Sequence, residues 1–313
     1  MGPMQNRIGF GFRPTDARSA VEIIVRAEAA GFGTAWTVMP ALGRDTMTLL
    51  AAAALRTSTI KLGTSIVPAF TRHPLALVTQ ALALEDLAPG RLRLGVGTSH
   101  QRTMIAAYGL PFDRPLAQLR EYVAILSAAL YTGRVAYTGA YYTAHAEFPT
   151  APGTPVLVSA LRDHAWELAG ELSDGGISWI TPLAYLTSGA KPAMARGAKR
   201  SGRPEPPVVG HVFVSAEPDR GVVRASVRES LGYYASAPFY QRMFEASGYP
   251  LGEGNAVPDA LIDALVISGD PGTIAQGLKE RLGGGIDEVL IDVVPGPDQR
   301  AAENAVFAVV RAL

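Results

Sequence analysis

The chain has 313 residues, 28 basic and 28 acidic residues, and no cysteine. The balanced and scattered charge argues against a nucleic-acid or anionic-membrane partner, and the missing cysteine excludes disulfides, thiolate catalysis and cysteine-ligated metals. The sequence shows no signal-peptide pattern, and its longest apolar runs are far too short to cross a bilayer, so we expect a cytoplasmic protein.

Short β-type runs alternate with helical patterns along the whole chain. Eight runs have the apolar character of strands buried in a parallel sheet: residues 7–12, 34–39, 60–67, 91–97, 155–159, 176–180, 208–215 and 287–293. Helical patterns follow each of them, including residues 74–87, 115–130, 165–172, 273–282 and 299–313. Asp16 and Asp45 are predicted N-caps, Gly31 is a predicted helix end, and Pro40 closes the second strand.

Two segments interrupt this alternation. Residues 135–148 are aromatic and alternating, which predicts a β-hairpin, and residues 219–282 form a long, mostly helical excursion. Eight βα units are the count of a TIM barrel. We therefore predict an α/β fold, a (β/α)8 TIM barrel with a hairpin after helix 4 and a helical insertion between strands 7 and 8. A doubly wound sheet is the alternative. Residues 4–313 form one domain, and residues 1–3 resemble an expression scar.

The fourth strand ends in glycines, two hydroxyls and a histidine, GVGTSH over residues 95–100. This is neither a Rossmann fingerprint, because His100 takes the place of the third glycine, nor a P-loop, because no Gly-Lys-Ser/Thr follows. In either architecture functional groups sit at the C-terminal ends of parallel strands. Glycine permits the close approach of a flat ring or phosphate there, whereas the simpler interpretation is barrel packing followed by a polar turn.

Seven motifs recur in order along the chain: LGTSIV (62–67), TRHP (71–74), RLRLGVG (91–97), FDRP (112–115), REY (120–122), PVLVSA (155–160) and LAG-x-x-x-DG (168–175). In this order and spacing they resemble the bacterial luciferase-like flavin and deazaflavin oxidoreductases. The resemblance covers nearly the whole chain. It is greatest to the branch that uses coenzyme F420, which includes proteins similar to methylenetetrahydromethanopterin reductase.

The resemblance implies that the strand ends cradle a flavin-like tricycle. It places a non-prolyl cis peptide at Ser65-Ile66, behind the ring, and it places Thr98 and Ser99 beside the cofactor. Further cofactor contacts are expected at Gly97, Ser159, Ala160, Leu161, Arg162, Trp179 and Ile180. Residues 159–162 lie near the phosphate, where a helix N-terminus supplies free N–H groups. Many relatives have Ala-x-Gly-Pro there, and Leu161-Arg162-Asp163 departs from that pattern, so Arg162 either pairs with phosphate or is an exposed helix residue.

The proton-handling residue is less clear from the sequence. Several relatives place an acidic residue and a histidine at the end of strand two, where this chain has Val38-Met39-Pro40. His100, with an ordinary pKa of about 6.5, is our candidate general acid, and a loop histidine that hydrogen-bonds the backbone is the alternative. The histidines are not spaced as a metal pair, so we predict no metal.

The predicted substrate side is mostly apolar. The candidate residues are Phe12, Trp36, Met39, Phe70, Tyr108 and Phe112, although each could instead belong to the core. Lysines, which meet the substrate in relatives that act on sugar phosphates, are scarce, so we expect a larger, mostly neutral small molecule. The tyrosines of the insertion and its Pro238-Phe239-Tyr240 run suggest a lid or a dimer contact.

We therefore predict an F420-dependent oxidoreductase, a reductase that transfers hydride from F420H2 to an electron-poor C=C or C=N bond, and we expect a homodimer. One alternative is an FMN-dependent monooxygenase of the same superfamily served by a separate flavin reductase. The second alternative is a catalytically silent partner subunit.

Overall fold

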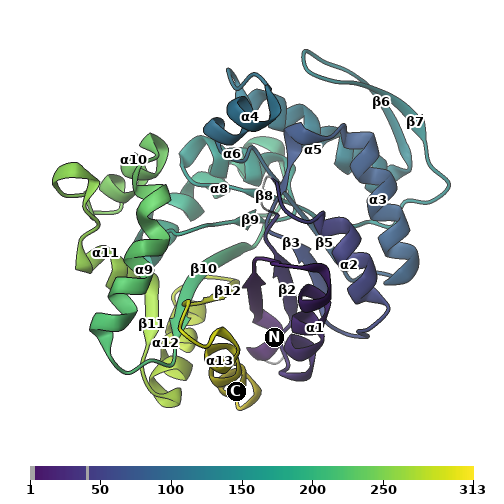
Figure 1. The fold of residues 1–313 in the computed structure, drawn as a ribbon. Helices are drawn as coiled ribbons and strands as arrows, with labels where there is room; N and C mark the ends of the chain where they lie inside the picture. The colour runs from purple at the N-terminus through teal and green to yellow at the C-terminus, as the bar shows by residue number, and fades with distance from the viewer. Residues whose placement is uncertain (1–3, 40–41) are drawn as a thin grey trace.

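Eight parallel strands form a closed ring at the centre of the molecule (Figure 1). The computed structural model describes residues 4–39 and 42–313. Around the ring the strands are β1 (Ile8–Phe12), β2 (Thr34–Thr37), β3 (Lys61–Thr64), β5 (Leu92–Gly97), β8 (Val156–Ser159), β9 (Gly176–Ile177), β10 (Val208–Ser215) and β12 (Glu288–Val293). The pairings of β9 with β10 and of β12 with β1 close the ring, so the predicted TIM barrel is confirmed and the doubly wound sheet is excluded.

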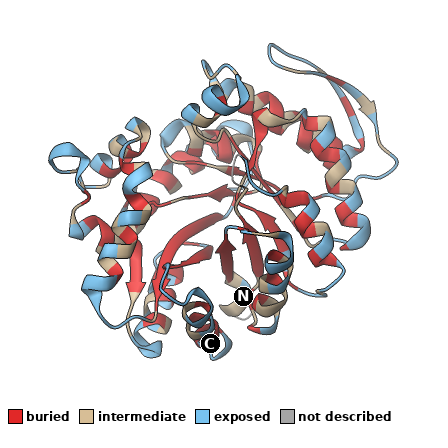
Figure 2. Cartoon of the chain, viewed as in Figure 1, coloured by how far each residue is buried: buried red, intermediate tan, exposed pale blue. Residues whose placement is uncertain are grey.

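Helices surround this ring and connect its strands. They are α1 (Ala17–Ala29), α2 (Thr46–Ala54), α3 (Pro74–Leu87), α4 (Gln101–Tyr108), α5 (Pro115–Thr132), α6 (Asp163–Leu172), α7 (Leu183–Tyr185), α8 (Lys191–Ser201), α9 (Arg220–Ala235), α10 (Pro238–Ala246), α11 (Asp259–Leu265), α12 (Pro271–Gly283) and α13 (Gln299–Arg311). The predicted caps are confirmed, because the side chains of Asp16 and Asp45 each accept a backbone hydrogen bond of 2.9 Å. Buried residues concentrate in the strands and on the inward faces of these helices (Figure 2).

The third predicted strand is interrupted. It divides into β3 and the short β4 (Val67–Pro68), which pairs with β5, and the peptide bond between Ser65 and Ile66 is cis. This confirms the conformation implied by the family resemblance. The interruption places Ser65 and Ile66 at the C-terminal mouth of the barrel, beside the end of β5.

Both insertions are present. The hairpin consists of β6 (Arg134–Thr138) and β7 (Thr143–Glu147) and projects away from the barrel (Figure 1). The second insertion holds α9, α10, α11 and α12, and also β11 (Val266–Ser268), which extends the sheet beside β10. A three-residue strand is too short for a periodic pattern, so the sequence did not predict β11. The α4 helix was also missed, because no side chain caps its N-terminus.

The floor of the barrel, at the N-terminal ends of its strands, holds a compact polar cluster. Trp36 Nε1 donates to Glu288 Oε1 at 2.8 Å, and Arg93 pairs with Glu288, donates to Thr34 Oγ1 at 2.9 Å and lies over the Trp36 ring. Trp36 is fully buried. The structure therefore corrects its assignment to the substrate site: β2 directs this side chain into the barrel interior, where it forms part of the floor.

Two predictions fall on residues outside the described ranges, namely the expression scar at residues 1–3 and the role of Pro40. Within the ranges that are described, no helix is both long and apolar enough to span a membrane.

Candidate active site

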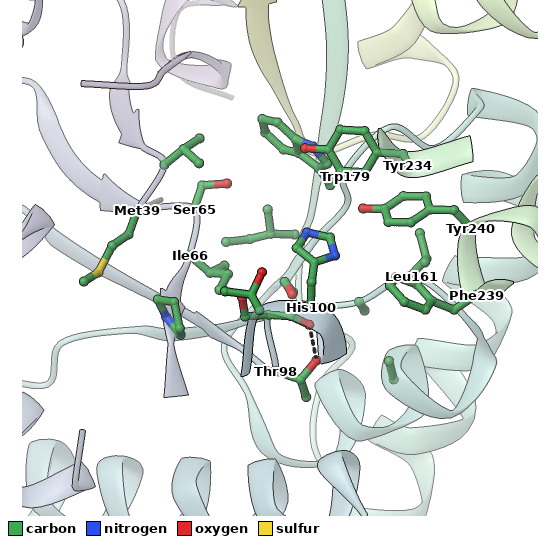
Figure 3. A pocket seen from close by; sticks show the side chains of 18 of the residues that line it. Met39, Ser65, Ile66, Thr98, His100, Leu161, Trp179, Tyr234, Phe239 and Tyr240 are labelled. Carbon is green, nitrogen blue, oxygen red and sulfur yellow. Dashed lines mark hydrogen bonds between the residues drawn. The ribbon is translucent and has the colours of Figure 1, made fainter. Parts of the chain in front are cut away.

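A cavity of about 440 Å³ opens at the C-terminal ends of the barrel strands (Figure 3). The predicted site residues that line it are Met39, Ser65, Ile66, Thr98, Ser99, His100, Ser159, Ala160, Leu161 and Trp179. They come from five different strand ends, which is the usual construction of a TIM-barrel active site. The prediction from the glycine-rich end of β5 thus located the mouth of this cavity.

Gly97 lies at a close contact beneath the cavity. A Cβ atom at this position would be 2.4 Å from Ser159 Oγ and 3.2 Å from Ile66 Cγ1. Both of those side chains line the cavity, so a larger residue at position 97 would push them into the space where a ligand would lie. The glycine therefore keeps this wall flat.

A second cavity of about 750 Å³ shares part of its lining with the first, including Thr98, Ser99 and Leu161. Its remaining lining includes the N-terminal turn of α6 and two arginines, Arg162 and Arg242. Arg162 occupies the N-cap position without a capping side-chain hydrogen bond. One carboxylate, that of Asp163, also lines this cavity and accepts a hydrogen bond of 2.9 Å from the Tyr185 hydroxyl. The helix N-terminus with its free backbone N–H groups and the two guanidinium groups outweigh this carboxylate and favour an anion in the cavity.

His100 is surrounded by aromatic rings from the insertion. Its ring lies 5.2 Å from Tyr233, 6.0 Å from Phe239 and 6.4 Å from Tyr240, centroid to centroid. Within the described part of the chain, its Nδ1 atom is buried without a hydrogen-bond partner. Burial lowers the pKa of His100 below the ordinary histidine value. The neutral imidazole therefore predominates at pH 7, and the role of His100 as general acid stays a prediction.

A network of side chains around the predicted residue Trp179 forms another part of the cavity wall, and the sequence analysis did not identify Arg13, His211 or Asp292 in it. Arg13 donates to Asp292 Oδ2 at 3.1 Å and lies over the Trp179 ring at 5.1 Å. Trp179 Nε1 donates to the Tyr234 hydroxyl at 3.0 Å, and its ring lies 4.1 Å from that of His211. These five residues come from β10, β12, α9 and the loops after β1 and β9.

Charge in this network is largely compensated. Burial raises the pKa of Asp292, but His211 and Arg13 outweigh that effect and hold it below its usual value. Burial likewise lowers the pKa of Arg13, but Asp292 and Tyr234 outweigh it and hold the pKa above its usual value. The pKa of His211 is lowered because burial outweighs the attraction of Asp292, whose carboxylate lies 3.5 Å away. The network therefore holds one cation, one anion and a neutral imidazole.

Several predicted site residues lie away from the first cavity. Phe112 and Arg162 line the second cavity, and Phe70 packs against Phe112 with ring centroids 6.0 Å apart. Phe12 stacks on Phe10 in the core at 5.8 Å, and Ile180 is fully buried. Tyr108 is partly exposed on α4. The structure thus corrects the assignment of Phe12 to the substrate side, because the ring of this residue points toward the helix layer.

The insertion supplies cavity residues of its own: Tyr233, Tyr234, Phe239 and Tyr240. The Pro238-Phe239-Tyr240 run was a recognisable signal, and of its two interpretations the structure supports the lid over the cavity. Arg13 had no such signal in the sequence, because a lone arginine after a strand is common. Among the described residues, no cluster of histidine and acidic side chains could hold a metal ion.

Comparison with known proteins matches residues 3–288 to the model of the family described as luciferase-like monooxygenase. An uncharacterized protein of Mycobacterium tuberculosis is 30% identical over 312 residues, covering 90% of this chain and 91% of that protein. The F420-dependent glucose-6-phosphate dehydrogenase of Nocardia farcinica is 29% identical, covering 90% of both chains. The solved coenzyme F420 dependent tetrahydromethanopterin reductase of Methanopyrus kandleri superimposes with a TM-score of 0.77 at 25% identity, covering 97% of both chains.

Proposed function

The chain belongs to the luciferase-like monooxygenase family, and from that premise we propose that it is a coenzyme F420-dependent oxidoreductase. We propose further that it works as a reductase, using F420H2 to reduce an electron-poor C=C or C=N bond of a small molecule. The F420-dependent relatives named above support the choice of cofactor.

The observation that carries the proposal is the pair of joined cavities. Arg13 is the one charged residue among the described residues that line the first cavity, and Asp292 pairs with it. The second cavity carries Arg162, Arg242 and the N-terminus of α6. F420 combines a flat tricyclic ring with a long tail that bears a phosphodiester and carboxylates, so its two parts match the two cavities. FMN carries a single phosphate group, so it would present fewer anionic groups to Arg162 and Arg242 than the F420 tail does.

The residues present fit this cofactor on structural grounds. Ser65 and Ile66 would lie against the ring, and the flat wall above Gly97 leaves the space that a ring requires. Thr98, Ser99 and Ser159 supply hydroxyl groups around its edge. The bound cofactor supplies the hydride chemistry, and the chain's own residues position the two reactants and exclude water.

The direction of reaction rests on the end of β2. Val38 and Met39 line the cavity where several relatives have an acid and a histidine. Neither side chain can take a proton from an alcohol, so the base that several relatives have at this position is missing here, and the neutral imidazole of His100 is the group in the described lining that could accept a proton. Reduction of a polarised double bond has no such requirement, because hydrogen bonds can stabilise the negative charge that develops on the substrate.

The test is a fluorescence titration of the purified protein with oxidised F420 and, separately, with FMN. We expect F420 to bind in the micromolar range and FMN to bind at least about tenfold more weakly, because FMN lacks the tail that the arginines would meet. The matched variants are Arg242→Ala and, as a control far from both cavities, Arg134→Ala in the hairpin, which forms an exposed ion pair with Glu147.

Three results would change the assignment. A preference for FMN would favour the monooxygenase. Binding of neither cofactor would favour the silent partner subunit. Equal loss of F420 binding in Arg242→Ala and Arg134→Ala would contradict the placement of the tail. The homodimer stays a prediction. The molar mass of the protein, measured by light scattering after size-exclusion chromatography, would test it.

A further inference from the structure

We propose that Arg13 and Tyr234 form the substrate-recognition pair of this site, and that they bind the oxygen of a neutral conjugated carbonyl compound, such as an enone. This deepens the proposed function, on which it rests, by naming the class of substrate. Nothing in the sequence pattern of the family motifs pointed to either residue.

The wall of the first cavity that faces away from the anion-binding cavity is aromatic. Trp179, Tyr233, Tyr234 and Tyr240 surround this end, and Figure 3 shows the Tyr240 hydroxyl directed toward the cavity from α10. Burial raises the pKa of Tyr240 well above its usual value, so this hydroxyl keeps its proton. Flat rings and hydroxyl groups of this kind suit a planar ligand that has a polar end.

Arg13 is the polar centre of this wall. Its side chain is 45% exposed and lines the cavity, whereas its partner Asp292 is 10% exposed and lies behind it. The hydrogen bond from Arg13 to Asp292 uses one guanidinium nitrogen, Nη1. A guanidinium carries five N–H donors, so donors remain for a ligand.

Tyr234 is held as a second donor. Its oxygen accepts from Trp179 Nε1 at 3.0 Å, and it also faces the Arg13 guanidinium. With donors directed at its lone pairs, the hydroxyl group turns its own hydrogen toward the remaining space, which is the cavity. Arg13 and Tyr234 together therefore present N–H and O–H donors to one acceptor.

The charge balance selects a neutral acceptor over an anion. Asp292 already compensates the charge of Arg13, so a ligand carboxylate at Arg13 would also meet the negative field of Asp292. A carbonyl oxygen accepts the same hydrogen bonds without that repulsion. Lysines and acidic side chains are absent from the described lining of the cavity, so no other group offers an anion or a cation a partner.

The recognised oxygen also fits the proposed reduction. Hydride adds to the carbon β to the carbonyl, the C=C electron pair moves toward the carbonyl, and negative charge develops on its oxygen beside Arg13 and Tyr234. The α carbon then takes a proton from water, and the carbonyl re-forms. The hydroxide that remains is neutralised by the second hydrogen of F420H2, which leaves as a proton, so the net change is enone plus F420H2 to saturated ketone plus oxidised F420. Donors placed at the developing oxyanion lower the barrier because the charge there is greater than in the ground state.

Binding can be measured without the cofactor, because the protein has its own probe. Trp36 and Trp166 are fully buried, so a change in tryptophan fluorescence on ligand binding reports Trp179 in the cavity wall. We would titrate three matched probes: cyclohexenone, cyclohexene and cyclohexenecarboxylate. Each titration would be repeated with F420 present, on the wild type, Arg13→Gln, Tyr234→Phe and Arg26→Gln. Arg26 is the control, because it lies on α1 and pairs with Glu303 outside this cavity.

We expect the wild type to prefer cyclohexenone over both other probes. Arg13→Gln should weaken cyclohexenone binding by about tenfold, the effect of losing a hydrogen bond to a charged group, and leave cyclohexene unchanged. Tyr234→Phe should act in the same direction, and Arg26→Gln should have no effect. Asp292→Asn, which frees the charge of Arg13, should shift the preference toward cyclohexenecarboxylate.

The outcomes separate the two proposals. Arg13-dependent binding of the enone in a protein that fails to bind F420 would keep the recognition pair and remove the cofactor assignment. Two results in a protein that binds F420 would overturn the recognition pair alone. One is an enone affinity that Arg13→Gln and Tyr234→Phe leave unchanged, and the other is no measurable enone binding by the wild type. Tighter binding of cyclohexenecarboxylate than of cyclohexenone by the wild type would also overturn the recognition pair.

Discussion

The floor and the mouth of the barrel both hold an arginine, a carboxylate and a tryptophan, but they satisfy these groups differently. At the floor Arg93, Glu288 and Trp36 bond to one another, and the carboxylate accepts from both partners. At the mouth Arg13 is partly exposed, Trp179 is shared with Tyr234, and the ring nitrogens of His211 have no hydrogen-bond partner within the described residues. The same residue types therefore stabilise the fold at the floor and leave hydrogen-bonding groups for a ligand at the mouth.

The difference shows how a structural polar cluster can be told from a functional one. A buried cluster that only supports the fold is complete by itself, since each unpaired polar atom costs free energy. A site that awaits a ligand keeps donors and acceptors free. Among the described residues, the unpaired ring nitrogens of His100 and His211 lie at or behind one cavity. Other buried polar atoms without a partner do not line that cavity; they belong to Thr37, Thr46, Tyr122, Ser127 and Trp166. The following variants test this difference between the floor and the mouth.

The largest effect is expected from the floor. Glu288→Leu leaves Arg93 as an uncompensated, mostly buried charge, so we expect a loss of about 3 kcal/mol or more in the free energy of unfolding. Cofactor affinity of the folded protein should not change. Urea unfolding followed by circular dichroism measures the free energy of unfolding, and F420 titration measures the cofactor affinity. Glu147→Leu, from an exposed pair in the hairpin, is the control and should cost less than about 1 kcal/mol. Equal losses in the two variants would refute the structural role of the floor.

At the mouth, Gly97→Ala should weaken F420 binding by about tenfold or more, because its methyl group would displace Ser159 into the cavity. The double variant Gly97→Ala/Ser159→Ala removes the atom that it meets and should recover much of the affinity. Unchanged binding in the single variant would place the ring elsewhere.

Acid should destabilise the mouth before the floor. His100 and His211 have pKa values below the ordinary histidine value of 6.5, so protons favour the unfolded state. Their contribution to stability is complete above pH about 6.5 and is lost as the pH falls from there through the lower folded-state values. The thermal midpoint should therefore fall on going from neutral pH to mildly acidic pH, and less steeply in His100→Phe. An identical pH dependence in that variant would show that His100 is not buried in the neutral form.

The smallest effect is expected on α9, the helix that carries Tyr233 and Tyr234. Gly232 is exposed, and an added Cβ atom there would meet nothing within 4 Å. Gly232→Ala should raise the unfolding free energy by up to about 1 kcal/mol, since glycine is a poor helix former. Ligand affinity should stay the same if α9 is already in its binding position. A fall in the rate of ligand association would instead show that the helix must open.

The barrel was predictable because its signals are local and repeated. Eight apolar runs, the caps at Asp16 and Asp45 and the hairpin all depend on neighbouring residues, and the structure has each of them. The end of β5 and the residues from Ser159 to Leu161 were also located correctly at the cavity. Their position follows from the rule that strand ends converge at one face.

The missed part of the site is held together by contacts between distant segments. Arg13 and Asp292 are 279 residues apart, and Trp179 and Tyr234 are 55 apart. No spacing rule connects such pairs. Trp36 was assigned to the wrong end of the barrel for a similar reason: only its hydrogen bond to Glu288, across 252 residues, distinguishes a floor position from a mouth position. The burial of His100, which makes it neutral, depends on an insertion more than a hundred residues further on.

The central claim is that one cavity takes the flat ring of the cofactor and the other takes its anionic tail. The most direct test compares F420 with its deazaflavin core, which has the ring but no phosphodiester tail, in titrations of the wild type and of Arg162→Ala/Arg242→Ala. We predict that F420 binds the wild type much more tightly than the core does, and that the double variant lowers F420 affinity to that of the core without changing core binding. Equal binding of F420 and the core by the wild type would contradict the account.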